Sequence, residues 1–267
     1  MAAGYYAAGS LEADDVESRN AAAEFGLPLG IAGWLHLGAG TSTTTVATAQ
    51  IDTTRAAISG GYDGQLVSIE AGYAYRNDSD SFEQSDLRAG TTFHLSRGNV
   101  GFDLFHRSAA DETISSIERR RRDPLAIRTV ESVKGIGYGL HGDVHVNEAL
   151  RLFASAMTYD YDTDVDGPAF LQRFPRLSLR ISGATRDAAY FDNTLRAGVS
   201  YDVAGCSLSA QLIRDQLLGT GETANTVELS AWIPAGNYWA FAPWLGQSSS
   251  DSEGDIVYGG LRISALW

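Results

Sequence analysis

Apolar and polar residues alternate with a period of two in many separate segments of this 267-residue chain. In an extended segment, Leu87, Ala89 and Phe93 would face one way while Arg88 and His94 would face the other. The same alternation recurs in residues 67–75, 195–201 and 227–233, and helical spacing fits none of these segments well. The chain is therefore predicted to be all-β, with strands that each carry one apolar face.

The overall composition hides this pattern. A hydrophobic content of 44% and a mean hydropathy of -0.14 would ordinarily indicate a soluble protein. A transmembrane barrel, however, faces lipid with only every second residue, whereas a membrane helix needs a run of about 18 or more apolar residues. The sequence has no such run. Composition alone leaves a soluble antiparallel β protein as an alternative.

The final segment, residues 255–267, favours the membrane alternative. Val257, Leu261 and Ile263 share one face with Trp267, the last residue, while Arg262 lies on the other. An alternating last strand that ends on an aromatic residue resembles the insertion signature of bacterial outer-membrane β-barrels. The resemblance implies a transmembrane antiparallel up-and-down barrel in the outer membrane of a Gram-negative bacterium. It also implies that the barrel-assembly machinery engages the strand ending at Trp267.

The spacing of short and long connections predicts about fourteen strands, with both termini on the periplasmic side. The expected strands are residues 4–11, 19–29, 31–41, 49–61, 65–76, 85–96, 99–107, 131–144, 149–160, 190–202, 206–214, 224–233, 238–246 and 255–267. Residues 4–11 are weakly patterned, and residues 177–182 alternate inside a long expected loop, so twelve or sixteen strands stay open. We expect one outer-membrane barrel domain over residues 1–267, because no linker or internal repeat is visible.

A barrel of about fourteen strands is wide enough for an aqueous lumen, which needs polar walls. The residues opposite the apolar face include both acids and bases, and we expect them to line a pore rather than a fully plugged interior. The expected pore-lining residues are Glu24, His36, Arg55, Glu70, Arg88, His94, Asp103, Arg196, Glu228 and Arg262.

The sharpest local charge feature is the run Arg119, Arg120, Arg121 and Arg122, which we place in an external loop of more than twenty residues. Folded inward, the run would form an electropositive constriction. Left outside, it would bind lipopolysaccharide phosphates. A solvated loop without either role is the third alternative.

Enzymatic and secretory functions have weaker support. His106 and Ser108 share a strand face, as in outer-membrane lipases, but Ala109 and Ala110 replace the Asn and Gly of that signature. The chain is also similar in length to autotransporter barrels of about twelve strands, which need an N-terminal helix through the pore. The only candidate for that helix is the short segment 11–20.

The remaining composition excludes several classes. A net charge of -13 argues against nucleic-acid partners, and the single Cys206 rules out multi-cysteine metal motifs. We expect neither cofactor nor metal. Residues 1–6 lack a secretory signal, so the simplest hypothesis is that the initiator Met has replaced one. The resemblance to small monomeric porin-like channels implies passive diffusion of small hydrophilic solutes or ions, with lipid and lipopolysaccharide as surroundings.

Overall fold

The computed structural model describes residues 5–15, 17–46, 49–79, 82–117, 125–162, 191–218, 221–251 and 254–267. Within these ranges the regular secondary structure is entirely β, and no helix is long and apolar enough to cross a bilayer. No cis peptide bond occurs in these ranges.

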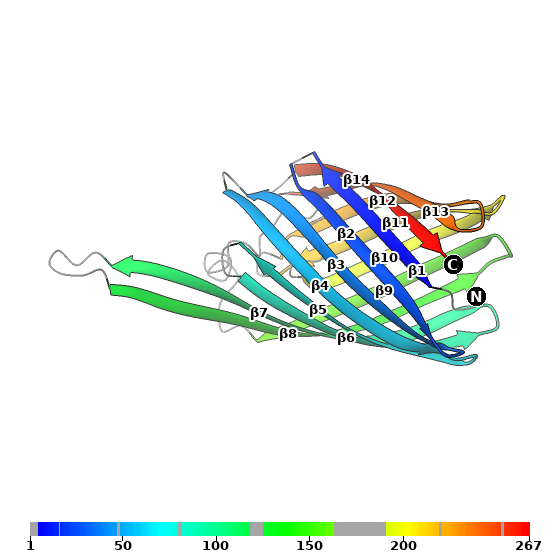
Figure 1. The fold of residues 1–267 in the computed structure, drawn as a ribbon, viewed down its shortest axis with the longest axis horizontal. Coiled ribbons are helices and arrows are strands. Elements are labelled where there is room, and N and C mark those ends of the chain that lie inside the picture. Colours follow the sequence, from blue (N-terminus) through cyan, green and yellow to red (C-terminus); the bar gives the residue numbers. More distant parts are fainter. Residues whose placement is uncertain are drawn as a thin grey trace.

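Fourteen antiparallel strands form a closed up-and-down barrel in which each strand pairs with its neighbours in sequence (Figure 1). The strands are β1 (Tyr6–Asp14), β2 (Arg19–Leu29), β3 (Gly33–Val46), β4 (Ala49–Asp63), β5 (Val67–Asp78), β6 (Phe82–Leu95), β7 (Gly98–Ile117), β8 (Leu125–His145), β9 (Leu150–Asp162), β10 (Phe191–Val203), β11 (Cys206–Leu217), β12 (Thr223–Ala235), β13 (Trp239–Ser250) and β14 (Gly254–Leu266). The predicted fold class and strand number are thereby confirmed.

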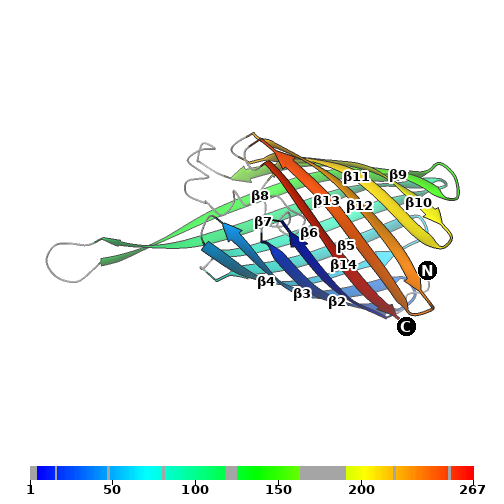
Figure 2. The same cartoon turned by 90° about the horizontal axis from the view of Figure 1, so that it is seen from above.

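The first and last strands close the barrel. β1 pairs with β14 from Tyr6 opposite Leu266 to Asp14 opposite Tyr258, so neither strand keeps an unpaired edge. Both termini lie at the same end of the barrel, next to the short turns (Figure 2). These turns fall where the sequence predicts them, and Gly30, Gly205 and Gly236 supply positive φ angles in three of them.

The outward face of the barrel wall is mainly apolar. Its leucines and isoleucines are exposed, among them Ile58 (46%), Leu140 (62%) and Leu212 (62%), although side chains of this kind are normally buried. A continuous apolar surface of this kind suits lipid rather than water. Outward-facing Tyr62 and Trp239 lie close to the short turns, as expected of an interface belt.

On the inward face, aromatic rings repeatedly lie flat over a glycine of the adjacent strand. The register places Tyr6 opposite Gly26, and a Cβ built on Gly26 would lie 2.1 Å from the Tyr6 ring. Other cross-strand pairs with the same close approach are Trp34 with Gly61, Phe153 with Gly198, Tyr159 with Gly137, Tyr161 with Gly135, Trp244 with Gly260 and Tyr258 with Gly246. The glycines thus hold large rings against the wall.

One expected loop is wrong. Most of the external loop of more than twenty residues expected after residue 107 is strand, because β7 and β8 continue to Ile117 and from Leu125 and project beyond the barrel (Figure 1). Beyond Asp111 this hairpin pairs only with itself, and its two strands satisfy each other's backbone groups. β1 is likewise longer than expected, whereas residues 177–182 lie outside the described residues.

Candidate functional site

Contacts that skip a strand identify the concave side of the wall. The Arg262 Nη2 on β14 donates to Glu24 Oε2 on β2 at 2.7 Å, across β1. The Tyr258 hydroxyl on β14 donates to Glu228 on β12 at 2.9 Å, across β13. Because only side chains on the inside of a curved sheet converge in this way, these residues face the lumen.

The register places all ten expected pore-lining residues on this same inward face. Pairing connects them in rows around the wall: Glu70 lies opposite Gly90, Gly90 opposite Asp103, and Asp103 opposite Gly139. That these residues line a permeation path stays a prediction. Arg119, Arg120, Arg121 and Arg122 lie outside the described residues.

An aromatic cluster lies near the short turns on β1 to β3. The His36 ring packs 4.4 Å from Trp34 and edge-on to Tyr6 at 5.1 Å, between centroids. The nearby ion pair of Glu24 and Arg262 completes this cluster. Inward-facing Trp34 and Trp244 lie flat against glycines, so they form part of the wall.

A hydrogen-bonded histidine network lines the lumen near the short turns of β5 to β8. The His94 Nε2 lies 2.7 Å from Ser68 Oγ, and its Nδ1 lies 2.7 Å from Asn99 Oδ1. The Asn99 Nδ2 donates to Asp143 at 3.0 Å, which leaves its oxygen to accept from His94. The adjacent His141 contacts Thr92 at 3.0 Å and Asp103 at 2.6 Å.

The order Ser68, His94 and Asn99 matches the nucleophile, base and orienting group of a hydrolase. Ester hydrolysis also needs donors aimed at a developing oxyanion. The backbone N–H groups around Ser68 are held in the ladders of β5 with β4 and β6, so they are not available for that role. We therefore interpret the network as a means of fixing polar side chains on the pore wall.

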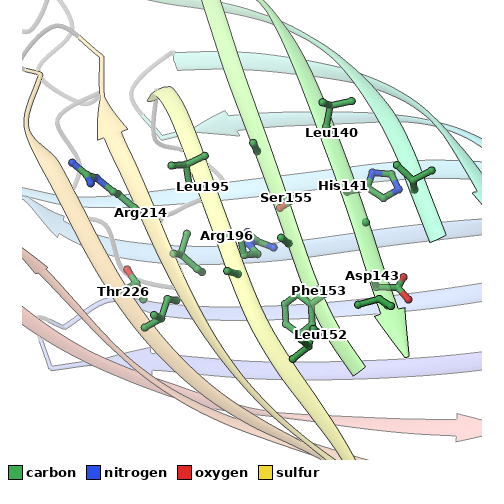
Figure 3. A pocket seen from close by; sticks show the side chains of 18 of the residues that line it. Leu140, His141, Asp143, Leu152, Phe153, Ser155, Leu195, Arg196, Arg214 and Thr226 are labelled. Carbon is green, nitrogen blue, oxygen red and sulfur yellow. The ribbon is translucent and has the colours of Figure 1, made fainter. Parts of the chain in front are cut away.

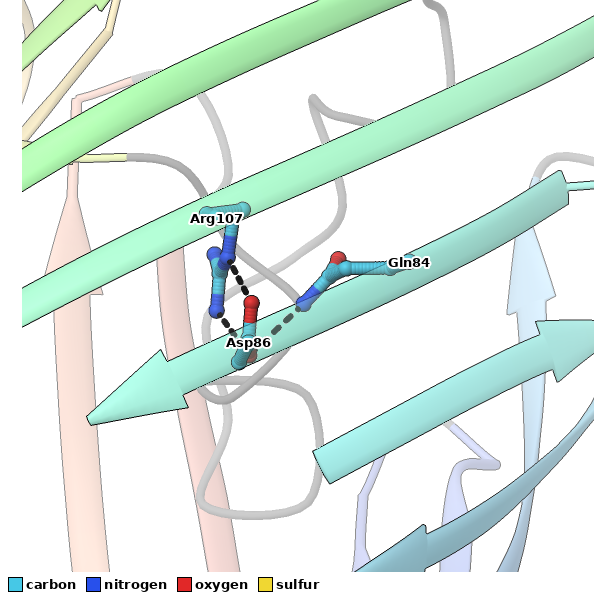
Figure 4. A network of polar contacts seen from close by, with 3 residues as sticks. All are labelled: Gln84, Asp86 and Arg107. Carbon is cyan, nitrogen blue, oxygen red and sulfur yellow. Dashed lines mark hydrogen bonds and ion pairs between the residues drawn. The ribbon is translucent and has the colours of Figure 1, made fainter. Parts of the chain in front are cut away.

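A buried ion pair lies further toward the β7–β8 projection (Figure 4). Arg107 donates from Nε to Asp86 Oδ1 at 2.8 Å and from Nη2 to Oδ2 at 2.9 Å, while Gln84 Nε2 donates to Oδ2 at 3.0 Å. The charged side chains are only 5% and 10% exposed. Such a bidentate pair neutralises both charges and fixes the strands' inner faces.

Next to this ion pair, residues of β5 to β11 line a lumen cavity of about 310 Å³, which we call the arginine–aromatic pocket. Phe105 is its centre: the guanidinium carbons of Arg88 and Arg107 lie 5.4 and 5.1 Å from the ring centroid. Tyr159 meets Phe105 edge-on at 5.6 Å and stacks on Tyr161 at 6.1 Å.

Glycines of β8 keep this pocket open. Gly135 and Gly137 face the lumen, and a Cβ on either would lie 2.4 or 2.7 Å from the rings of Tyr161 or Tyr159. A Cβ on Gly139 would similarly lie 2.8 Å from Met157. The alternating glycines therefore form a flat bed on which the side chains of β9 lie against the wall.

Only some of the charged side chains that line the pocket have an oppositely charged or hydrogen-bonding partner. Arg107 binds Asp86, Asp103 binds His141, and Asp215 has an interaction partner of its own. By contrast, the Arg196 Nε is buried without a hydrogen-bond partner, and Arg88 has its cation–π contact but no ion pair in the described part of the chain. Glu70 is likewise without a partner among the described residues. Sequence parity predicts all three residues, but it does not reveal which charges are already paired.

The weaker functional alternatives are less well supported. His106 and Ser108 lie on the outward face of β7, and no hydrogen bond joins their side chains in the structure. Residues 11–20 form the end of β1, a turn and the start of β2 where the autotransporter alternative needs a helix. Among the described residues, no group of three or more His, Cys, Asp or Glu side chains is placed to hold a metal ion.

A groove of about 960 Å³ crosses β7 to β12 (Figure 3). Gly142, Ala154 and Ala197 lie side by side on the outward face and are bordered by the exposed Leu140 and Leu212. Lumen-facing residues such as Arg196 also border it through the thin wall. The groove belongs to the apolar belt and not to the lumen.

The residues that sequence reasoning missed are lumen aromatics and the buried ion pair. Phe105, Tyr159, Asp86 and Arg107 all follow the parity that identifies Arg88 and Asp103. The signal for the pocket is the alternating glycine sequence from Gly135 to Gly139, opposite a strand rich in tyrosine.

Comparison with solved structures shows a shared barrel fold. The protein described as "CymD monoaromatic hydrocarbon channel" superimposes with a TM-score of 0.64 at 9% identity, covering 100% of this chain and 89% of that chain. A Pseudomonas aeruginosa FadL homologue gives a TM-score of 0.54 at 10% identity, covering 98% and 88%. A bacterial polysaccharide outer membrane secretin gives 0.50 at 9% identity, covering 100% and 99%. No family model and no curated protein matches the sequence.

Proposed function

We propose that this protein is an outer-membrane channel for passive diffusion of small hydrophilic solutes or ions. The observation that carries the proposal is the lumen wall, where charged side chains of both signs face inward while leucines and isoleucines cover the outside. Charged side chains at membrane depth are costly unless they meet water or one another. The structural likeness to outer-membrane channel barrels supports the same assignment.

The proposal places the apolar belt in outer-membrane lipid, with the short turns in the periplasm and the β7–β8 hairpin outside the cell. Lipopolysaccharide would surround the outer half, and Arg119 to Arg122 would contact its phosphates or the pore mouth. The ten expected pore-lining residues would set a weak ion preference, since both acids and bases are present.

The test is single-channel conductance of the purified protein in a planar bilayer, with the reversal potential measured under a salt gradient. We expect stable conductance steps, and we expect Arg196→Glu to shift the reversal potential toward cation preference because the lumen loses positive charge. Arg97→Glu, in a short turn outside the wall, is the control and should shift it far less. A folded barrel without conductance would overturn the proposal.

A further inference from the structure

The arginine–aromatic pocket combines charges that are free with rings that are held in place. In the described part of the chain, Arg88 and Arg196 lack a carboxylate partner, whereas Arg107, Asp103 and Asp215 are engaged. Two guanidinium groups therefore remain to bind an anion in an enclosed part of the lumen. A guanidinium group is well suited to a carboxylate because it can donate two parallel hydrogen bonds.

The rest of the lining is aromatic. Phe105, Tyr159 and Tyr161 contact one another in edge-on and stacked arrangements, and buried Phe191 packs against Tyr159. Aromatic rings pack favourably against other rings in offset or edge-on geometry. The glycine bed of β8 holds the tyrosines flat, so their packing surfaces are set before a ligand arrives.

The volume limits the size of the ligand. A cavity of about 310 Å³ is at the lower end of the range for small-molecule sites, about 300–1,000 Å³. It suits one ring with a short substituent. Glu70 also lines the pocket and repels a dianion more strongly than a monoanion, so a monoanion is favoured.

From these observations we propose that the pocket binds small aromatic monocarboxylates as they pass through the lumen. This inference rests on the proposed channel function and adds the solute class that the pocket retains. Arg88 and Arg196 bind the carboxylate, Phe105 and Tyr159 pack against the ring, and Glu70 disfavours dicarboxylates.

The first experiment is calorimetric titration of the detergent-purified barrel with four probes. Benzoate should bind more tightly than cyclohexanecarboxylate, which lacks the aromatic ring, benzyl alcohol, which lacks the charge, and phthalate, which carries a second carboxylate. This comparison uses the unaltered protein. Absence of benzoate binding, or equal binding of benzoate and any one of the other three probes, would overturn the inference.

The second experiment locates the site. Arg88→Met and Arg196→Met should each weaken benzoate binding at least about tenfold, since each removes a charge-assisted hydrogen bond to the carboxylate. Arg97→Met in a periplasmic turn is the matched control and should leave binding unchanged. If both lumen variants fold, as judged by heat-modifiable electrophoretic mobility, and bind benzoate normally, the inference is wrong.

Failure of the inference and failure of the channel function are distinguishable. A conducting barrel that does not bind benzoate would keep the channel function and overturn the ligand class. A barrel that binds benzoate yet never conducts would overturn the channel function and leave the ligand class supported. In a conducting barrel, benzoate should also interrupt the current of the unaltered protein more often than that of Arg196→Met.

Discussion

At the residue scale, the pairing of lumen aromatics with glycines decides how much of the barrel interior stays open. A ring on one strand can lie flat only if the residue opposite has no side chain, and Gly137 meets this need for Tyr159. The same glycines weaken β propensity, so the ring and the glycine compensate each other. This arrangement gives a structural role to seven of the 29 glycines in the chain.

The substitution Gly137→Ala tests this role. Its new Cβ would lie 2.7 Å from the Tyr159 ring and 3.2 Å from the Phe105 Cβ, so the ring must leave the wall and enter the lumen. We expect single-channel conductance to fall and the free energy of unfolding in urea to drop by about 1–3 kcal/mol, as for other overpacked sites.

Gly38→Ala is the matched control, because Gly38 also faces the lumen but its Cβ would have ordinary contacts of 3.8 Å or more. It should leave conductance and unfolding nearly unchanged. Equal behaviour of the two variants would show that the glycine bed does not position Tyr159.

The lumen residues illustrate what sequence parity can and cannot predict. The face of Glu24 or Arg262 follows from its position in an alternating strand, because successive side chains point to opposite sides. The contact between these two residues does not follow, since it depends on the stagger of β14, β1 and β2 around the closed barrel. For the same reason, the pocket formed by strands as distant as β5 and β11 is invisible in the sequence.

At the element scale, strand positions were predictable because lipid and water impose opposite requirements on alternate residues. The prediction failed for the outer parts of β7 and β8, where no lipid faces the strand and the apolar alternation fades in residues 111–117. Strand pairing persists there because the two strands satisfy each other's backbone hydrogen bonds.

Replacing residues 112–131 with a two-residue turn should leave the barrel folded. Residues 112–117 pair only with β8, and residues 125–131 pair only with β7, so their loss exposes no edge of another strand. We expect unchanged heat-modifiable mobility and, because the outer ends of β7 and β8 lie beyond the barrel, a nearly unchanged conductance (Figure 1).

The same deletion removes Arg119 to Arg122 and so tests their two suggested roles. A rise in conductance with loss of anion preference would support an inward constriction and contradict our expectation for the hairpin. Unchanged conductance with weaker binding to lipopolysaccharide would support the external role. Deletion of residues 30–32 in a short turn would not serve as a control for this hairpin deletion, because Gly30 supplies a positive φ that the turn between β2 and β3 needs.

At the scale of the whole molecule, one closed sheet separates two solvents. The outward leucines and isoleucines are stable only against lipid, and the inward charges only against water or one another. Neither face explains the fold alone, and the mean hydropathy of -0.14 is the average of the two. Closure of the sheet depends on the pairing of β14 with β1.

Substitution of Trp267 separates two effects, namely recognition of the last strand during assembly and stability of the folded barrel afterwards. Its backbone N–H donates to the Tyr5 carbonyl at 3.1 Å, a bond that Trp267→Ala keeps, while its ring is exposed at the end of the barrel that carries the short turns. Trp239 is a similarly exposed ring at the same end, so Trp239→Ala is a matched control for the lost membrane-interface contact.

After refolding in lipid vesicles, the two variants should have similar urea midpoints. In bacterial cells, however, we expect only Trp267→Ala to reduce the folded amount in the outer membrane several-fold, because only the terminal aromatic would be recognised by the assembly machinery. Equal losses in cells would instead assign both rings to anchoring in the membrane.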